Sequence, residues 1–107
     1  MRTSYTAVVE RNIPVQGQFQ TEPYECGWAD EAIIFLRTLE GDLSGVNGFV
    51  QISPDGMNWC NEGSVISLPG GGETSFVKVR HFGNWLRLRM DTGAKTGTVL
   101  VTLHLKE

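Results

Sequence analysis

Residues 98–106 read Thr98-Val99-Leu100-Val101-Thr102-Leu103-His104-Leu105-Lys106, and they carry the clearest structural signal in the chain. Large apolar residues occupy every second position from Val99 to Leu105. Successive side chains of a β-strand point to opposite faces, so this alternation is typical of a strand with one buried face. The stretch therefore predicts a β-strand that packs on a core.

The rest of the chain repeats this organisation, with short apolar runs separated by turn residues such as Pro54-Asp55-Gly56. We expect further strands over residues 3–10, 15–21, 24–28, 48–53, 57–60, 64–68, 74–82 and 85–91. About eight to ten short strands predict an all-β fold, an antiparallel two-sheet β-sandwich or jelly roll, with a closed small barrel as the alternative. A length of 107 residues fits a single domain spanning 1–107.

The segment Asp30–Leu39 is ambiguous. Asp30 could cap a helix, and the apolar residues that follow it include a helical spacing. However, Ile33-Ile34-Phe35 is rich in β-forming residues, and the segment ends at Gly41. We expect a buried strand, because a lone helix among strands would need a layer of its own.

Charge and hydropathy exclude several classes of function. The net charge of −3 gives no general attraction to nucleic acid or to anionic membranes. No apolar run is long enough to span a membrane, and the first residues lack the apolar core of a signal peptide. We expect cytoplasmic synthesis, and association with a virion or another particle.

Residues that could carry catalysis or bind metal are few and dispersed. Neither His81 nor His104 has a second ligand at metal-binding spacing, and the carboxylates are scattered. Cys26 and Cys60 are expected to be free, mostly buried thiols, although one disulfide would form if their strands were neighbours. We therefore expect no enzyme activity, no metal and no cofactor.

The stretch from Thr74 to Asp91 predicts a β-hairpin with a two-residue turn at Gly83-Asn84. The core face would then hold Val77, Val79, Leu86, Leu88 and Met90, with His81 at its rim. The opposite face would hold a candidate interaction surface, which consists of Lys78, Arg80, Phe82, Trp85, Arg87 and Arg89.

This register places Arg80 opposite Arg87 and Lys78 opposite Arg89. Like charges that face each other across strands destabilise a sheet by up to about 1 kcal/mol per pair. Carboxylates on a neighbouring strand would offset this cost. Alternatively, a partner would bring the negative charge, as another subunit, a polyanion or an acidic glycan could. Phe82 and Trp85 beside the basic residues would supply typical interface anchors.

Ser53-Pro54-Asp55-Gly56-Met57-Asn58-Trp59, followed by the strands around Phe76–Arg80 and Trp85–Leu88, resembles two groups of proteins. One is the discoidin-like sandwiches, which bind glycans or lipids through loops. The other is the small β-sandwich proteins of phage and virus structural genes. The resemblance covers about Phe49–Met90 and implies the fold. The chain lacks the terminal cysteines of the discoidin family, so no binding residue is carried over.

The leading hypothesis is a non-enzymatic structural or interaction protein in an oligomeric assembly, such as a virion, phage or particle surface. Its partners would be copies of itself or another protein subunit, and a polar strand with Gln16, Gln18 and Gln20 on one face would suit edge pairing. The alternative is a carbohydrate-binding module with a glycan site formed by Trp85, Phe82, Asp55 and Asn58. A small hydrolase is a remote third possibility.

Overall fold

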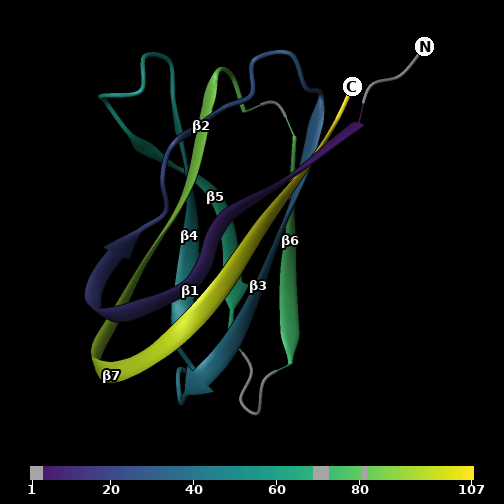
Figure 1. Cartoon of the computed structure of the whole chain (residues 1–107). Coiled ribbons are helices and arrows are strands. Elements are labelled where there is room, and N and C mark those ends of the chain that lie inside the picture. Colours follow the sequence, from purple (N-terminus) through teal and green to yellow (C-terminus); the bar gives the residue numbers. More distant parts are fainter. Residues whose placement is uncertain (1–3, 69–72, 81) are drawn as a thin grey trace.

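The computed structural model describes residues 4–68, 73–80 and 82–107, and every regular element within these ranges is a β-strand (Figure 1). The strands are β1 (Ser4–Gln20), β2 (Tyr24–Glu25), β3 (Glu31–Gly41), β4 (Asn47–Ser53), β5 (Cys60–Ser67), β6 (Thr74–Arg80) and β7 (Trp85–Lys106). All of their pairings are antiparallel. Within the described ranges there is no helix that could cross a membrane.

The long strand β7 belongs to both layers of the molecule (Figure 1). Its first part, residues 85–90, pairs with β4, whereas residues 97–106 pair with β3. Between these parts the chain turns at Gly93, which has a φ of 62°, and the Thr92 hydroxyl donates to the carbonyl of Lys95 at 2.8 Å. Because of this bend, the alternating apolar residues of one strand line the core from both sheets.

We name the two layers after their central short strands. The β4 sheet contains β5, β4, the first part of β7, β2 and the end of β1; the β3 sheet contains β6, β3, the second part of β7 and the start of β1. β1 follows β7 along both layers (Figure 1), with register shifts between Val8 and Glu10, between Glu10 and Ile13, and between Gln16 and Gln18. Pro14 lies between two of these shifts and is itself in register with Thr98; such irregularities are usual on an edge strand.

The core lies between the two sheets and is built from alternate residues of their strands. Buried residues of β7 and its neighbours include Leu86, Leu88, Met90, Val99, Val101, Leu103, Leu105, Ile34, Leu36 and Val50. Each such side chain contributes roughly 1.5–3 kcal/mol through the removal of apolar surface from water. The all-β, two-sheet sandwich expected from the sequence is confirmed, and the Asp30–Leu39 segment is a strand.

Two features of the strand prediction need correction. The described ranges hold seven strands where ten were expected. Residues 4–10 and 15–20 belong to one strand, residues 85–91 and 98–106 belong to another, and the separate strands expected at 57–60 and 64–68 are one strand that begins at Cys60. The break expected at Pro14 does not occur, because residues 13–16 pair with β7 in register, and around Gly93 the chain bends but stays one strand. The loop expected at Pro69–Gly72 and the position of His81 lie outside the described residues.

The predicted hairpin between β6 and β7 is wrong. β6 pairs with β3, and the first part of β7 pairs with β4, so Gly83-Asn84 connects two different sheets. A turn signal specifies a change of direction, but it does not specify which strand supplies the hydrogen bonds. The core face of the prediction is nevertheless confirmed, because alternation alone determines it: Val79, Leu86, Leu88 and Met90 are buried and Val77 packs against them.

The two cysteines are free, and they differ in exposure. Cys26 is buried, as expected, and burial raises the pKa of its thiol to about 12. Cys60 is exposed at the start of β5, so the expectation of a buried thiol is wrong there. The strand begins directly after the Pro54–Trp59 loop, and the Cys60 thiol lies 3.7 Å from the carbonyl oxygen of Ile52 on β4.

Candidate functional site: the outer face of the β4 sheet

The outer face of the β4 sheet gathers aromatic, arginine and amide side chains. β4 and β7 pair with Phe49 opposite Arg89, Gln51 opposite Arg87 and Ser53 opposite Trp85. These residues alternate with core residues, so they point away from the other sheet. We call this surface the Arg87 face and define it by Gln20, Phe49, Gln51, Trp59, Asn61, Trp85, Arg87 and Arg89.

Arg87 is held in place from three sides. Its Nε donates to Oε1 of Gln51 at 2.8 Å, and its Nη1 donates to Oε1 of Gln20 at 3.0 Å. Its Cζ lies 4.2 Å from the ring centroid of Trp59, which is a cation–π geometry. Gln51 is itself oriented because its Nε2 donates to Oδ1 of Asn61 at 3.0 Å. The guanidinium is therefore fixed by neutral groups from three other segments.

The charge of this face is not neutralised by the residues that the structure describes. Among the described residues, neither Arg87 nor Arg89 forms an ion pair. Partial burial, together with repulsion from Arg89, lowers the pKa of Arg87 from its usual value. Buried or half-buried charges are normally paired, so the absence of a carboxylate here distinguishes this face.

The Pro54–Trp59 loop covers one end of the Arg87 face. Asp55 organises the loop, because its carboxylate accepts hydrogen bonds from the backbone N–H groups of Met57 and Asn58, both at 2.9 Å, and from the Ser53 hydroxyl. These hydrogen bonds lower the pKa of Asp55 well below its usual range. Gly56 lies against the indole ring of Trp85: a Cβ at this glycine would sit 3.2 Å from the ring.

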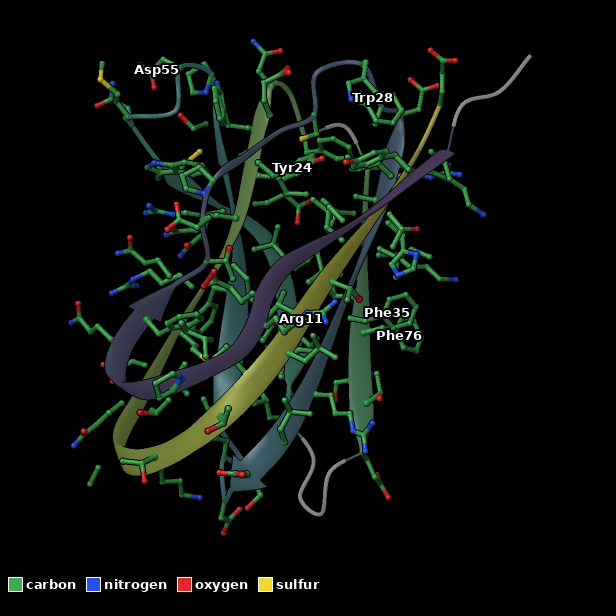
Figure 2. The ribbon with its side chains drawn as sticks, in the orientation of Figure 1. Arg11, Tyr24, Trp28, Phe35, Asp55 and Phe76 are labelled. Carbon is green, nitrogen blue, oxygen red and sulfur yellow. The ribbon has the colours of Figure 1, made fainter. Side chains whose placement is uncertain are left out.

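The outer face of the β3 sheet carries the other predicted basic residues. Arg80 forms an ion pair with Glu31 on the neighbouring strand, with 3.0 Å between Nη2 and Oε2. This is the carboxylate compensation that the sequence left open, and it holds for Arg80. Phe76 is 57% exposed here, and its ring centroid lies 6.0 Å from that of Phe35 (Figure 2).

The structure divides the predicted interaction surface. Trp85, Arg87 and Arg89 share the Arg87 face, whereas Lys78 and Arg80 belong to the β3 sheet. Phe82 is only 2% exposed and belongs to the core. The six residues therefore do not form one surface, because the hairpin that would join them does not exist. That the three residues on the Arg87 face bind a partner stays a prediction.

The alternative glycan site is also altered by the geometry. Trp85, Asp55 and Asn58 do meet at the Pro54–Trp59 loop, but Phe82 is buried. The Asp55 carboxylate and the Asn58 amide are already bonded to each other, with 2.8 Å between Nδ2 and Oδ2. These two side chains hold the loop together, so the quartet does not form an open polar site.

Five residues of the Arg87 face were not assigned to the interaction surface from the sequence: Gln20, Phe49, Gln51, Trp59 and Asn61. The signal for Gln20 was its place in a polar, alternating strand, which predicted an exposed face. No local signal joins Gln51, Trp59 or Asn61 to Arg87, because their contact depends on the pairing of β4 with β7 and with β5. Only the long-range register brings these side chains together.

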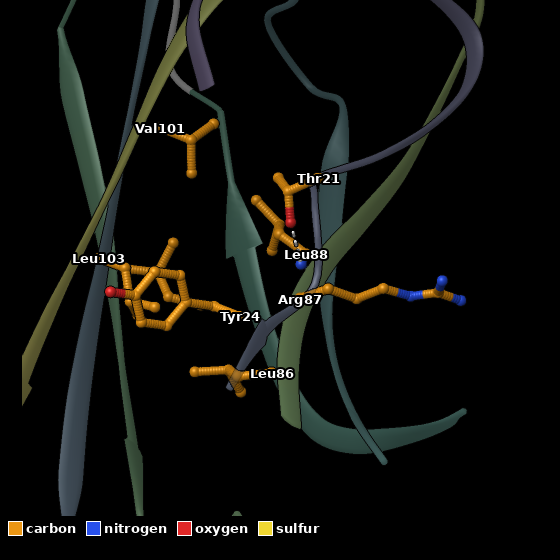
Figure 3. A pocket seen from close by; sticks show the side chains of 8 residues that line it. Thr21, Tyr24, Leu86, Arg87, Leu88, Val101 and Leu103 are labelled. Atoms are coloured by element: carbon orange, nitrogen blue, oxygen red, sulfur yellow. Dashed lines mark hydrogen bonds between the residues drawn. The ribbon is translucent and has the colours of Figure 1, made fainter. Parts of the chain in front are cut away.

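The interior offers little space for a small-molecule ligand at the centre of the sandwich. A cavity of about 10 Å³ lies there, lined mainly by apolar side chains that include Tyr24 and Leu103 (Figure 3). Its polar neighbour Thr21 uses its hydroxyl to accept the N–H of Leu88 at 3.0 Å, and Arg87 points away from it (Figure 3). A volume of this size holds about one water molecule. No cluster of metal-ligating side chains occurs among residues 4–68, 73–80 and 82–107.

Comparison with known proteins identifies the fold but no family. No protein-family model matches the chain, and no curated protein matches its sequence. Among solved structures, the SPBc2 prophage-derived protein YomS is similar with a TM-score of 0.67 and 8% sequence identity, covering 100% of this chain and 96% of that one. The expected resemblance to phage β-sandwich proteins is thus confirmed at the level of fold.

Two further structures extend this likeness. The PBSX exported protein XepA is similar with a TM-score of 0.71 and 8% identity over 94% of this chain, which spans 36% of XepA. The CBM36-1 domain of a multidomain xylanase from the hindgut metagenome of Trinervitermes trinervoides is similar with a TM-score of 0.52 and 9% identity, covering 97% of this chain and 96% of that domain. At these identities the likeness shows a shared fold alone.

Proposed function

We propose that the chain is a non-enzymatic structural or interaction protein that acts in an oligomeric assembly, such as a virion, phage or particle surface. The Arg87 face carries this proposal. Arg87 is ordered by Gln51, Gln20 and Trp59, yet no carboxylate among the described residues pairs with it or with Arg89. Aromatic and arginine side chains are enriched at protein interfaces, and a partner's carboxylate would complete the charge balance.

Sedimentation velocity over a wide range of protein concentrations tests this proposal. We expect the mean sedimentation coefficient to rise with concentration, and to rise less for Arg87→Glu. Lys78→Glu is the matched control, because it reverses a charge on the outer face of the other sheet and should change association less. A strict monomer at every concentration, with no effect of Arg87→Glu, would contradict the proposal.

A second candidate function is carbohydrate binding. The Trp59 ring, the exposed Asn61 amide N–H groups and the Nη2 of Arg87 favour it, because sugars stack on aromatic rings and hydrogen-bond to such donors. The shared fold with the CBM36-1 domain is compatible with such a role. In this arrangement Trp59 is the aromatic residue that would stack on a sugar, a role that was predicted for Phe82.

Affinity electrophoresis in gels with embedded polysaccharide tests the second candidate. A carbohydrate-binding protein should be retarded, and Trp59→Ala should remove most of the retardation. Trp28→Ala serves as the matched control, because Trp28 is exposed in the 26–30 loop and outside the Arg87 face. Equal mobility of the wild type in gels with and without polysaccharide would rule out this reading for the sugars used.

A further inference from the structure

Charge is segregated between the faces and the loops of this molecule. Every described lysine and arginine lies in a strand, whereas six exposed carboxylates lie outside the strands. These carboxylates are Glu22, Asp30, Asp42, Asp55, Glu73 and Glu107. The net charge of the whole chain is −3, and the negative charge is concentrated in the loops, whereas the strands carry the positive charge. One copy therefore carries both halves of a complementary charge pattern.

One end of the sandwich combines such carboxylates with exposed apolar side chains. We call residues 26–30 and 54–58 the loop end; Trp28 and Asp55 lie at this end in Figure 2. Met57 is 79% exposed and Trp28 is 38% exposed. The Asp30 carboxylate makes no hydrogen bond or ion pair with any described residue. This end thus offers a carboxylate that no described residue binds, two residues along the chain from the exposed Trp28, and a second exposed apolar side chain, Met57, on the other loop.

The Arg87 face offers the matching features. With Nε and Nη1 of Arg87 engaged by Gln51 and Gln20, its Nη2 makes no hydrogen bond with a described residue. Arg89 stands on the same side of β7, and Val65, which is 48% exposed, is paired with Phe49 next to them. A guanidinium held in this way loses little conformational freedom when it binds a carboxylate.

We propose that the loop end of one copy docks on the Arg87 face of the next, so that the protein associates with itself head to side. This inference rests on the proposed function and names its partner as a second copy of the chain. A symmetric contact between two Arg87 faces would oppose arginines to arginines, which charge repulsion disfavours. A contact between two different surfaces is heterologous, and it generates either a ring or a filament.

Complementary charge reversal tests the proposal. Arg89→Glu reverses the face, and Asp30→Lys reverses the loop end; neither side chain makes a hydrogen bond with a described residue, so both variants should fold. We expect each variant alone to associate at least about tenfold more weakly than the wild type in sedimentation velocity, the size of one close charge pair. Thermal unfolding of each variant verifies its fold.

An equimolar mixture of the two variants gives the decisive reading. In the mixture the reversed face of one variant meets the reversed loop end of the other, and the unreversed surfaces also match. Association should therefore return to within about threefold of the wild type, since both attractive pairs are restored. The chain with both reversals should recover in the same way. Lys78→Glu and Glu73→Lys, which lie outside the two surfaces, are the matched controls.

The outcomes separate this inference from the proposed function. A wild type that self-associates while the mixture stays as weak as its components overturns the head-to-side contact and leaves the assembly role standing. Equal weakening by Lys78→Glu also overturns it, because the effect would then be one of net charge. A wild type that is monomeric at the highest concentration overturns both.

Discussion

Arg87 lies over the indole ring of Trp59, with its Cζ 4.2 Å from the ring centroid. Arg87 lies on β7, and Trp59 directly precedes β5. The strand between β5 and β7 in the sheet is β4, which carries Gln51. The contact fixes a positive charge on the outer face of the β4 sheet without neutralising it. It therefore links the stability of this part of the fold to the surface that we propose to bind a partner.

A double-mutant cycle should measure this contact. Trp59→Ala and Arg87→Ala are each expected to destabilise the fold, and together to cost less than the sum of the two. The coupling free energy should be about 0.5–1 kcal/mol, as for a partly exposed cation–π pair. Urea unfolding of the four proteins gives the values. A parallel cycle of Trp59→Ala with Arg89→Ala is the control, and coupling of equal size there would show that general charge effects are being measured.

The Asp55 loop should make stability depend on acid pH. Backbone N–H groups of Asn58 and Met57 hold the pKa of Asp55 below its unfolded value, so this carboxylate stabilises the fold above about pH 4 and loses that contribution as the pH falls. Asp55→Asn is expected to be less stable than the wild type at neutral pH, and the difference should shrink below about pH 4. Urea unfolding between neutral and acid pH measures it.

Asp30→Asn is the matched control for this prediction, because Asp30 is exposed in a loop and its carboxylate makes no hydrogen bond with a described residue. It should leave stability nearly unchanged at neutral pH. If the difference between Asp55→Asn and the wild type stayed constant down to the lowest pH, the loop would not depend on the ionised carboxylate.

The fold class was predictable from the sequence because alternation is a local property. Residues 98–106 and the core face of residues 77–90 show which side chains are buried without any knowledge of the partner strand. The partner itself is a long-range property. The Gly83-Asn84 turn fits a hairpin, yet β7 gains more by pairing with β4 and β3 in turn, because its two apolar stretches then face one core from both layers.

The candidate site shows the same division. Alternation placed Trp85, Arg87 and Arg89 on one outward face, and the structure retains that arrangement. Alternation gave no indication that Gln51 and Trp59 would contact Arg87, since these contacts depend on the register of β4 against β7. Nor could composition reveal that the basic residues lie in strands and many carboxylates in loops at the ends of the sandwich.

The contact between β3 and the bend of β7 should depend on Gly41. This residue has a φ of 83°, and a Cβ there would lie 2.5 Å from the carbonyl oxygen of Thr96. Gly41→Ala should therefore cost roughly 1–2 kcal/mol for the backbone conformation and roughly 1–3 kcal/mol more for the clash with a backbone atom. Gly45→Ala is the control: its φ is 80°, but nothing lies within 4 Å of its Cβ position. Equal losses in urea unfolding would show that the bend yields to the added methyl group.

The two cysteines should differ sharply in their reactivity. The thiolate is the nucleophile, and burial raises the pKa of Cys26 to about 12, so this thiol is both covered and protonated at neutral pH. Cys60 is exposed, so iodoacetamide should alkylate one cysteine per folded chain and two after unfolding in urea. Mass spectrometry measures the count, and Cys60→Ser should abolish the fast reaction whereas Cys26→Ser should retain it. Cys26 donates its backbone N–H to the carbonyl of Asn84 at 2.7 Å, and its buried thiol can react only when the 82–84 segment moves away from it. Rapid alkylation of Cys26 in the folded protein would therefore mean that this region opens on the time scale of the reaction.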